Sequence, residues 1–388
     1  MFLFSNGVPL EEERELKREA RKRGLLVMGP DCGTAILRGV PLGFANVVRR
    51  GSIGLVAASG TGLQEVTCRI HALGEGVSHA IGTGGRDVSD ALDGATMQQA
   101  LDLLGADEAT RVICIVSKPP SPPVARRIAE HARATGKGCV ILFLGAAPHA
   151  LPGSPGIVFA TTLSEAARAA VALARGEPLA PSHEEDAGQE QAAEEARRLA
   201  RGQWRVAGLF SGGTFCAEAQ AIWTRLGLRV CSNVPLENVQ PLAEGTRADA
   251  HLALDLGTEE FTTGKPHPMI DMATRIEALA GLADDPAVAA VVLDVVLGYG
   301  SHADPAGALA PAIAAAKARA AAAGRHLCVV AFACGTEQDP KALSSQRSKL
   351  AAAGALLAES STAASRLAAA IAAAARRAHE AHGQPVAG

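Results

Sequence analysis

The fold of this chain is decided by a strand, a turn of small residues and a helix that follow one another directly: Gly51-Ser-Ile-Gly-Leu-Val-Ala-Ala-Ser-Gly-Thr-Gly-Leu-Gln-Glu-Val66. Ile53 to Ala57 is a short apolar run, which is typical of a buried parallel strand. Small residues then interrupt the run, and apolar residues recur at helical spacing. Because such a turn aims backbone N–H groups at one point, it predicts an anion site, usually for a phosphate. The alternative is a turn that only joins strand to helix.

The same order of features occurs a second time. Val206-Ala-Gly-Leu-Phe-Ser-Gly-Gly-Thr-Phe-Cys-Ala-Glu218 again runs from an apolar strand through small residues into a helix. One offset (213 − 60 = 153) aligns Gly60 with Gly213 and Glu65 with Glu218. Two later pairs of stretches match in the same order: 81–85 with 254–258, and 112–116 with 291–295. We therefore expect two similar α/β domains, whose helix N-termini could face one shared phosphate.

Length and composition exclude several classes of protein. The chain has 388 residues, a hydrophobic fraction of 48% and 41 glycines, which suits two or three α/β domains. A net charge of −3 and an aromatic content of 3% argue against a nucleic-acid or membrane-surface role. Without a transmembrane run or a secretory signal we expect a cytoplasmic protein. The eight cysteines form no C-x-x-C pair, so neither a zinc site nor a disulfide framework is indicated, and no metal is predicted.

Alternating strand and helix patterns predict two doubly wound parallel sheets of the flavodoxin-like type. Before them, Met1 to Phe4 and Leu25 to Met28 are expected to be strands on either side of a helix, as in the last third of a Rossmann-type domain. The expected parts are a Rossmann-type remnant (1–50), a first α/β domain (51–176), an exposed linker (177–203), a second α/β domain (204–378) and a frayed tail (379–388).

The motifs, taken in order, resemble the succinyl-CoA synthetase superfamily. Gly29-Pro-Asp-Cys-Gly33 and Ile81-Gly-Thr-Gly-Gly85 are similar to the α subunit, and Ser211-Gly-Gly-Thr214 is similar to the ligase domain of the β subunit. The resemblance is strongest to the FdrA family, which fuses both ligase domains in one chain, and four stretches carry it: 25–34, 82–87, 116–120 and 264–271. It implies two ligase-type domains, preceded by a CoA-binding-like remnant of a shortened first domain.

The resemblance also indicates which chemistry to expect. The synthetases activate a carboxylate through a phosphorylated histidine in a Gly-His-Ala-Gly-Ala loop, whereas this chain continues as His149-Ala-Leu-Pro-Gly. Lys118 stands where the family has a glutamate that supports this histidine. We therefore expect no phosphohistidine chemistry. Because the chain has no ATP-grasp domain, we expect that without partner subunits it does not use ATP.

The anion site, by contrast, persists in the sequence. Its candidate donors are Ser59, Gly60, Thr61, Gly62, Ser211, Gly212, Gly213 and Thr214. Lys118 could add positive charge at a sheet edge, or could be a solvated loop lysine. Arg86 could clamp a carboxylate, or could pair with Asp87 or Asp90.

Two further residues stand out for their surroundings. His267 lies between two prolines in Lys265-Pro-His-Pro268, where it could act as an acid–base group or an anion donor, or could only fix its loop. Asp294 lies within an apolar strand, so it needs a partner if it is buried, and we expect it to hold a neighbouring loop.

Three functions from different classes are consistent with these residues. The first is an acyl-CoA-synthetase-like ligase for a small carboxylate, with CoA as a possible ligand. The second, implied by the resemblance to the FdrA family, is a carbamoyltransferase subunit that converts oxalurate and phosphate into oxamate and carbamoyl phosphate. The third is a non-catalytic scaffold or regulatory subunit. We favour the second, with phosphate as ligand, Lys118, His267 and Arg86 as candidate catalytic residues, and partner subunits or a homo-oligomer.

Overall fold

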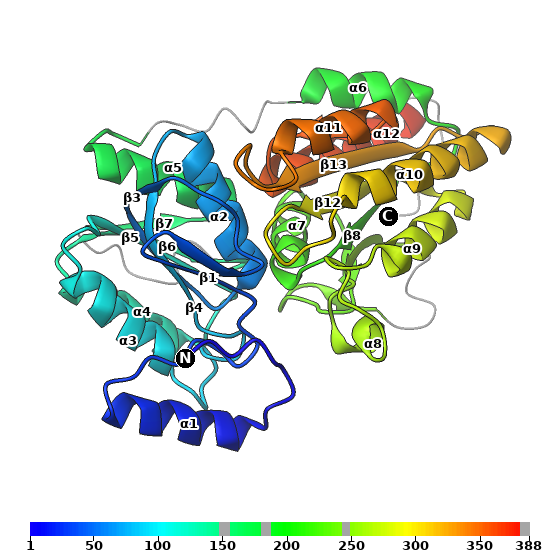
Figure 1. Cartoon of the computed structure of the whole chain (residues 1–388). Helices are drawn as coiled ribbons and strands as arrows, with labels where there is room; N and C mark the ends of the chain where they lie inside the picture. The colour runs from blue at the N-terminus through cyan, green and yellow to red at the C-terminus, as the bar shows by residue number, and fades with distance from the viewer. Residues whose placement is uncertain (147–155, 180–187, 243–248, 381–388) are drawn as a thin grey trace. The chain divides into compact units, whose positions relative to one another are not determined.

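The computed structural model describes residues 1–146, 156–179, 188–242 and 249–380. Two compact units are present, and each is built on a seven-stranded sheet with helices on both faces (Figure 1). The first comprises Met1–Pro181, Gly298–Gly300 and Gln338–Pro340, and the second comprises Ser182–Leu297, Ser301–Glu337 and Lys341–Gly388. Among the described helices, none is both long enough and apolar enough to span a membrane.

The first unit has a mixed sheet in the order β2-β1-β4-β3-β5-β6-β7. Its strands are β1 (Thr34–Leu37), β2 (Val40–Gly43), β3 (Arg50–Ala57), β4 (Val77–Gly82), β5 (Val112–Ser117), β6 (Gly138–Phe143) and β7 (Ile157–Ala160). Its helices are α1 (Leu10–Lys22), α2 (Gly60–Ala72), α3 (Ala95–Ala106), α4 (Pro122–Ala134) and α5 (Leu163–Arg175). Strands β3 to β7 are parallel and follow the flavodoxin-like order, which confirms the predicted fold class. Helices α2 and α5 cover one face, and α3 and α4 cover the other (Figure 1).

Helix α2 begins where the sequence predicts. Ser59 has extended backbone (φ −157°), and its Oγ accepts a hydrogen bond from the Gly62 N–H at 3.0 Å. A serine cap of this kind stabilises a helix by about 1 kcal/mol. Leu63, Val66 and Ile70 then form the fully buried stripe that packs on the sheet.

The first fifty residues differ from the expected strand–helix–strand piece. Met1 to Phe4 and Leu25 to Met28 were expected to be strands, but they share only one isolated bridge, between Phe2 and Met28. The regular strands of this region are β1 and β2, which form a hairpin, and β1 pairs antiparallel with β4. Residues 1–50 therefore contribute to the sheet of the first unit.

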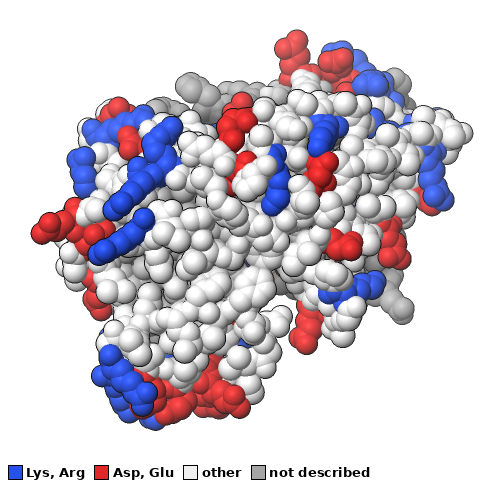
Figure 2. Space-filling model, in the orientation of Figure 1, with Lys and Arg blue, Asp and Glu red and all other residues white. Residues whose placement is uncertain are grey.

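A buried group of charges attaches α1 to the same unit. Lys17 is 5% exposed, and its Nζ lies 2.8 Å from Asp87 Oδ1 and 2.9 Å from Glu13 Oε1. Asp87 also accepts hydrogen bonds from the N–H groups of Thr96 and Met97, at the start of α3. The outer face of α1 instead carries exposed charges of both signs (Figure 2). Thus α1 is fixed through its polar side chains more than through an apolar stripe.

The second unit repeats the architecture, with the sheet order β10-β9-β11-β8-β12-β13-β14. Its strands are β8 (Arg205–Phe210), β9 (Val230–Ser232), β10 (Gln240–Pro241), β11 (His251–Asp255), β12 (Val288–Val296), β13 (Cys328–Cys334) and β14 (Leu356–Ala358). Its helices are α6 (Gln189–Arg198), α7 (Gly213–Arg225), α8 (Glu259–Thr262), α9 (Ala273–Asp284), α10 (Pro305–Ala322), α11 (Leu343–Ala352) and α12 (Ser361–Glu380). The run β11-β8-β12-β13-β14 matches β4-β3-β5-β6-β7 strand for strand, which confirms the internal repeat.

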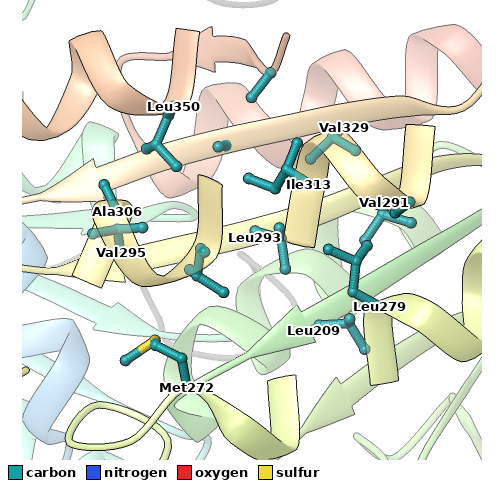
Figure 3. Packing of buried hydrophobic residues seen from close by; sticks show 14 of the residues in the cluster. Leu209, Met272, Leu279, Val291, Leu293, Val295, Ala306, Ile313, Val329 and Leu350 are labelled. Carbon is teal, nitrogen blue, oxygen red and sulfur yellow. The ribbon is translucent and has the colours of Figure 1, made fainter. Parts of the chain in front are cut away.

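Apolar packing in the second unit centres on β12, in which every residue is buried. Val291, Leu293 and Val295 point from one face of this strand toward α9 and α10, where Leu279 and Ile313 meet them (Figure 3). Each such side chain contributes roughly 1.5–3 kcal/mol through burial. The intervening residues of β12 face the opposite side of the sheet, and Asp294 is one of them.

Asp294 is fully buried and is held by three donors, as its place in an apolar strand requires. Its Oδ1 accepts a hydrogen bond from the Ser211 N–H at 2.8 Å, and its Oδ2 accepts one from the Ser211 hydroxyl. The guanidinium of Arg275, which is 1% exposed, lies 3.5 Å from Oδ1 and also donates to the backbone carbonyl of Asp294. The expectation that this carboxylate holds a neighbouring loop is therefore confirmed.

We predict that Asp294→Asn lowers the free energy of unfolding by about 3–5 kcal/mol, because Arg275 would remain buried without its counter-charge. The matched control is Asp249→Asn, since the pair of Asp249 with Arg229 is exposed and should contribute at most about 1 kcal/mol. Urea unfolding of both variants measures the difference. Equal stability of the two variants would show that the Asp294 network does not hold the fold.

A second prediction concerns pH. His251 is 3% exposed, its Nδ1 accepts a hydrogen bond from the Val206 N–H at 3.0 Å, and burial lowers its pKa from 6.5 to about 4. The unfolded chain therefore takes up this proton near pH 6.5, whereas the folded chain does so only near pH 4. Stability should fall as pH falls across this window, by roughly 3 kcal/mol from this group. His251→Gln, which does not titrate, should lose less stability between pH 7.5 and pH 4.5 in urea unfolding. Identical losses would contradict the assignment.

Candidate functional site

In each sheet the strand order reverses at one central strand, with the next strands of the chain added on its two opposite sides. In the first unit β3 lies between β4 and β5, and in the second unit β8 lies between β11 and β12. Ligands of open α/β sheets bind outside the carboxyl ends of the strands at such a point. The predicted turns 59–62 and 211–214 directly follow β3 and β8, so each lies at the switch point of its own sheet.

In the first unit the turn leads into the N-terminus of α2. Among the described residues, the N–H groups of Gly60 and Thr61 donate to no other protein group. Thr34, at the start of β1, lies beside them: a Cβ placed on Gly60 would be 3.7 Å from Thr34 Oγ1. This hydroxyl is buried and has no hydrogen-bond partner within the described part of the chain. Two backbone donors and one unsatisfied hydroxyl thus lie at the positive end of a helix dipole.

Three charged residues lie near this edge of the first sheet. Lys118 follows β5 on the loop at this edge of the sheet. Arg86 donates to the carbonyl of Val8 and lies 2.7 Å from Glu13 Oε2, so its partner is on α1 and is neither Asp87 nor Asp90. Burial raises the pKa of Asp31, and the positive charges of Arg86 and Lys118 oppose that rise. Arg86 and Lys118, the two cations predicted as site residues, therefore both act on the carboxyl group of Asp31.

In the second unit the corresponding turn is held differently. The hydroxyl of Ser211 is bound to Asp294, and Gly212 caps α7 without a side-chain hydrogen bond. Gly213 and Thr214 begin the helix, and Thr214 is buried. Ser211 therefore serves to position the turn, and its hydroxyl already donates to a carboxylate. The backbone at the start of α7 is the part that resembles an anion site.

His267 lies close to this turn, although 53 residues separate it from Thr214 (267 − 214 = 53). A Cβ on Gly257 would be 2.8 Å from His267 Nε2, 3.0 Å from the Ser211 carbonyl oxygen and 3.2 Å from Asp255 Oδ1. These three polar groups therefore converge on a glycine, where a larger side chain would not fit. His267 Nδ1 accepts a hydrogen bond from the Met269 N–H at 3.2 Å, which assigns the proton of the neutral ring to Nε2.

The imidazole of His267 is kept neutral by its surroundings. Burial lowers its pKa, Arg275 lowers it further, and the negative charge of Asp294 only partly opposes this. At neutral pH the ring is therefore an uncharged donor through Nε2. It can donate a hydrogen bond to a ligand oxygen or accept a proton after changing its tautomer.

The structure thus brings the predicted residues together within each unit. Ser59, Gly60 and Thr61 meet at the head of α2, and the turn at 211–214 meets His267. That both turns hold one shared phosphate stays a prediction, and His149 lies outside the described residues. Two residues of these sites, Thr34 and Asp255, were missed. Both lie within stretches that the sequence singles out, 25–34 and 254–258, but no spacing to a second site residue distinguishes either of them.

Models of two protein families match the chain. The CoA binding domain matches residues 48–145, and the CoA-ligase domain matches residues 209–371. The first match falls on the region that the resemblance assigned to a first ligase-type domain. The second falls on the predicted β-subunit-like domain.

Similar proteins are found among curated sequences and solved structures. The uncharacterized protein YahF of Escherichia coli K12 is 45% identical over 364 residues, which is 93% of this chain and 70% of YahF. The ADP-forming sulfoacetate-CoA ligase subunit SauD of Bilophila wadsworthia is 31% identical over 121 residues, which is 30% of this chain and 40% of SauD.

Among solved structures, the dinucleotide forming acetyl-coenzyme A synthetase 1 of Ca. Korarchaeum cryptofilum is 18% identical, with a TM-score of 0.36, and the match covers 99% of this chain and 80% of that chain. A TM-score at this level supports no conclusion about activity. The matched family models and the long match to YahF lead to one conclusion. The chain belongs to the succinyl-CoA synthetase superfamily and, within it, to the same family as YahF.

Proposed function

We propose that the chain is a phosphate-binding subunit of an enzyme that transfers a small acyl or carbamoyl group. The observation that carries this proposal is the buried, unpartnered hydroxyl of Thr34 beside the head of α2. Leaving a buried hydroxyl unsatisfied costs about 1–3 kcal/mol. A bound anion would accept its hydrogen bond together with those of the Gly60 and Thr61 N–H groups.

Charge at the same sheet edge favours an anionic ligand. Lys118 lies on the loop after β5, and its ammonium would add positive charge for a phosphate oxygen. The Arg86 side chain is 45% exposed despite its pair with Glu13, and in this proposal it binds the carboxylate of the second substrate. His267 is the acid–base candidate within the second unit, where its neutral ring lies beside the turn at 211–214.

The finer proposal is a carbamoyltransferase subunit of the FdrA type. A phosphate oxygen attacks the carbamoyl carbon of oxalurate, the bond from that carbon to the oxamate nitrogen breaks, and a proton is delivered to that nitrogen. The products are carbamoyl phosphate and oxamate. This route needs no phosphoenzyme, which agrees with the missing Gly-His-Ala-Gly-Ala loop and with Lys118 at the position of the family glutamate.

An acyl-CoA-synthetase-like ligase is the second candidate. The matched CoA binding and CoA-ligase domain models favour it, and SauD is described as a subunit of a CoA ligase. In that case CoA would be a ligand and a small carboxylate the substrate. Both candidates would place the chain in an assembly with partner subunits or further copies of itself. Exposed apolar side chains on Met1, Phe4, Leu25 and Val40 support such an assembly.

Thr34→Val tests the phosphate site directly. The hydroxyl has no partner in the described structure, so its removal should leave the free energy of unfolding unchanged or slightly higher. Phosphate affinity, measured by isothermal titration calorimetry, should fall about tenfold, because one hydrogen bond to a charged ligand is lost. The matched control is Thr224→Val, since Thr224 Oγ1 is also buried without a partner but lies near the other end of a helix. Equal phosphate affinity for wild type and Thr34→Val would contradict the proposed site.

The ligase reaction of the superfamily passes through a phosphohistidine, whereas the proposed carbamoyl transfer forms no phosphoenzyme. We predict that the protein forms no acid-labile phosphohistidine when it is incubated with labelled acyl phosphate or ATP and resolved at alkaline pH. We also predict carbamoyl phosphate as the product from oxalurate and phosphate once partner subunits are present. Label retained on a histidine, together with CoA binding in the calorimeter, would favour the ligase and contradict direct transfer.

A further inference from the structure

A second group of reactive side chains lies in the second unit, away from the carboxyl ends of its strands. Glu195 is on α6, whereas Cys328 begins β13 and His326 lies two residues before it. One ligand atom from each of the three lies within 4.8 Å of the other two. His326 Nε2 is 2.6 Å from Glu195 Oε2, and Cys328 Sγ is 3.2 Å from the same oxygen.

We propose that Glu195, His326 and Cys328 form a binding site for a thiophilic divalent cation, Zn²⁺ in the first instance. Thiolate, imidazole and carboxylate are the donors that Zn²⁺ accepts, at about 2.0–2.3 Å. A cation at that distance from all three needs only small side-chain movements, because the donor atoms already converge. Three protein ligands leave the fourth tetrahedral position for a water molecule or a small ligand.

The surroundings hold two of the ligands in place. Arg198 lies 2.9 Å from Glu195 Oε1, the carboxylate oxygen that does not face the cluster. Gln203 is fully buried, and it accepts a hydrogen bond from the His326 N–H at 3.1 Å while donating to the His326 carbonyl at 2.8 Å. Such outer contacts orient metal ligands and are part of a functional site. They also fix the backbone from which His326 and Cys328 project.

The charge balance suits a divalent cation. The carboxylate of Glu195 and the thiolate of Cys328 together neutralise the two positive charges of Zn²⁺. Binding releases the thiol proton of Cys328 to solvent, and affinity therefore rises with pH. Arg198 and Lys317 are the cations near the cluster; Arg198 is paired with the outer oxygen of Glu195, and Lys317 donates to the Leu327 carbonyl. A bound ion would link α6, which packs along α12, directly to β13.

The experiment uses full-length protein without a polyhistidine tag. Zn²⁺ is titrated against a chromophoric chelator, and Co²⁺ is added in parallel as a spectroscopic probe. Wild type should bind one equivalent of Zn²⁺, and the Co²⁺ form should show a thiolate-to-cobalt charge-transfer band together with the visible bands of tetrahedral coordination. Cys328→Ser should lose that band, and Zn²⁺ affinity should fall at least about 100-fold, since loss of an outer-shell partner alone costs 10–100-fold.

Cys139→Ser is the matched control. Cys139 lies near the start of β6, the strand that corresponds to β13 in the first unit, and its described contacts are with Thr135 and with backbone carbonyls. Glu195→Gln keeps the shape of the side chain, so it provides a second variant if Cys328→Ser does not fold, and it should also weaken Zn²⁺ binding. Absence of a Zn²⁺ equivalent in wild type, or unchanged affinity in Cys328→Ser or Glu195→Gln, would overturn the site. The three residues would then be only a hydrogen-bonded contact between α6 and β13.

Discussion

The second unit depends on one buried carboxylate. Asp294 lies within an otherwise apolar, fully buried strand, where an unpaired charge would be strongly destabilising. Its hydrogen bonds to Ser211 fix the turn after β8, and its pair with Arg275 connects that turn to α9. The turn leads into the head of α7, and its Ser211 carbonyl is one of the polar groups that approach Gly257 together with His267 Nε2. The need to pair the buried charge of Asp294 thus fixes the turn at Ser211, beside which His267 lies.

The fold was largely predictable because strand and helix periodicities agree with the turn chemistry in both repeats. The turns at Ser59 and Ser211 and the strand β12, which is apolar except for Asp294, could be recognised from the chain alone. The β1–β2 hairpin could not be predicted. Its turn places Arg38 at φ 51°, before Gly39, and arginine rarely adopts this left-handed conformation. The strand expected from Met1 to Phe4 was wrong, because this apolar run meets Leu25 to Met28 in one isolated bridge and not in a ladder.

Side-chain partners were harder to predict than elements. The repeat aligned Glu218 with Glu65 but predicted no partner for either residue. In the structure Glu218 accepts hydrogen bonds from Ser361 and Thr362 at the start of α12, so it connects two helices. Thr34 and the Glu195 cluster were missed because their importance lies in distances between segments far apart in the chain. Scattered cysteines excluded a zinc motif by spacing, but spacing says nothing about a histidine and a cysteine that meet a glutamate 131 residues earlier.

The central claim is that an anion binds at the head of α2, where Thr34 supplies the hydroxyl that no described protein group uses. The most direct test is a crystal structure with arsenate, a phosphate analogue whose arsenic can be located by anomalous scattering. The account predicts an arsenic peak within hydrogen-bonding reach of the Gly60 N–H, the Thr61 N–H and Thr34 Oγ1. An arsenate bound elsewhere in the first unit, or no peak near α2 at saturating arsenate, would contradict it.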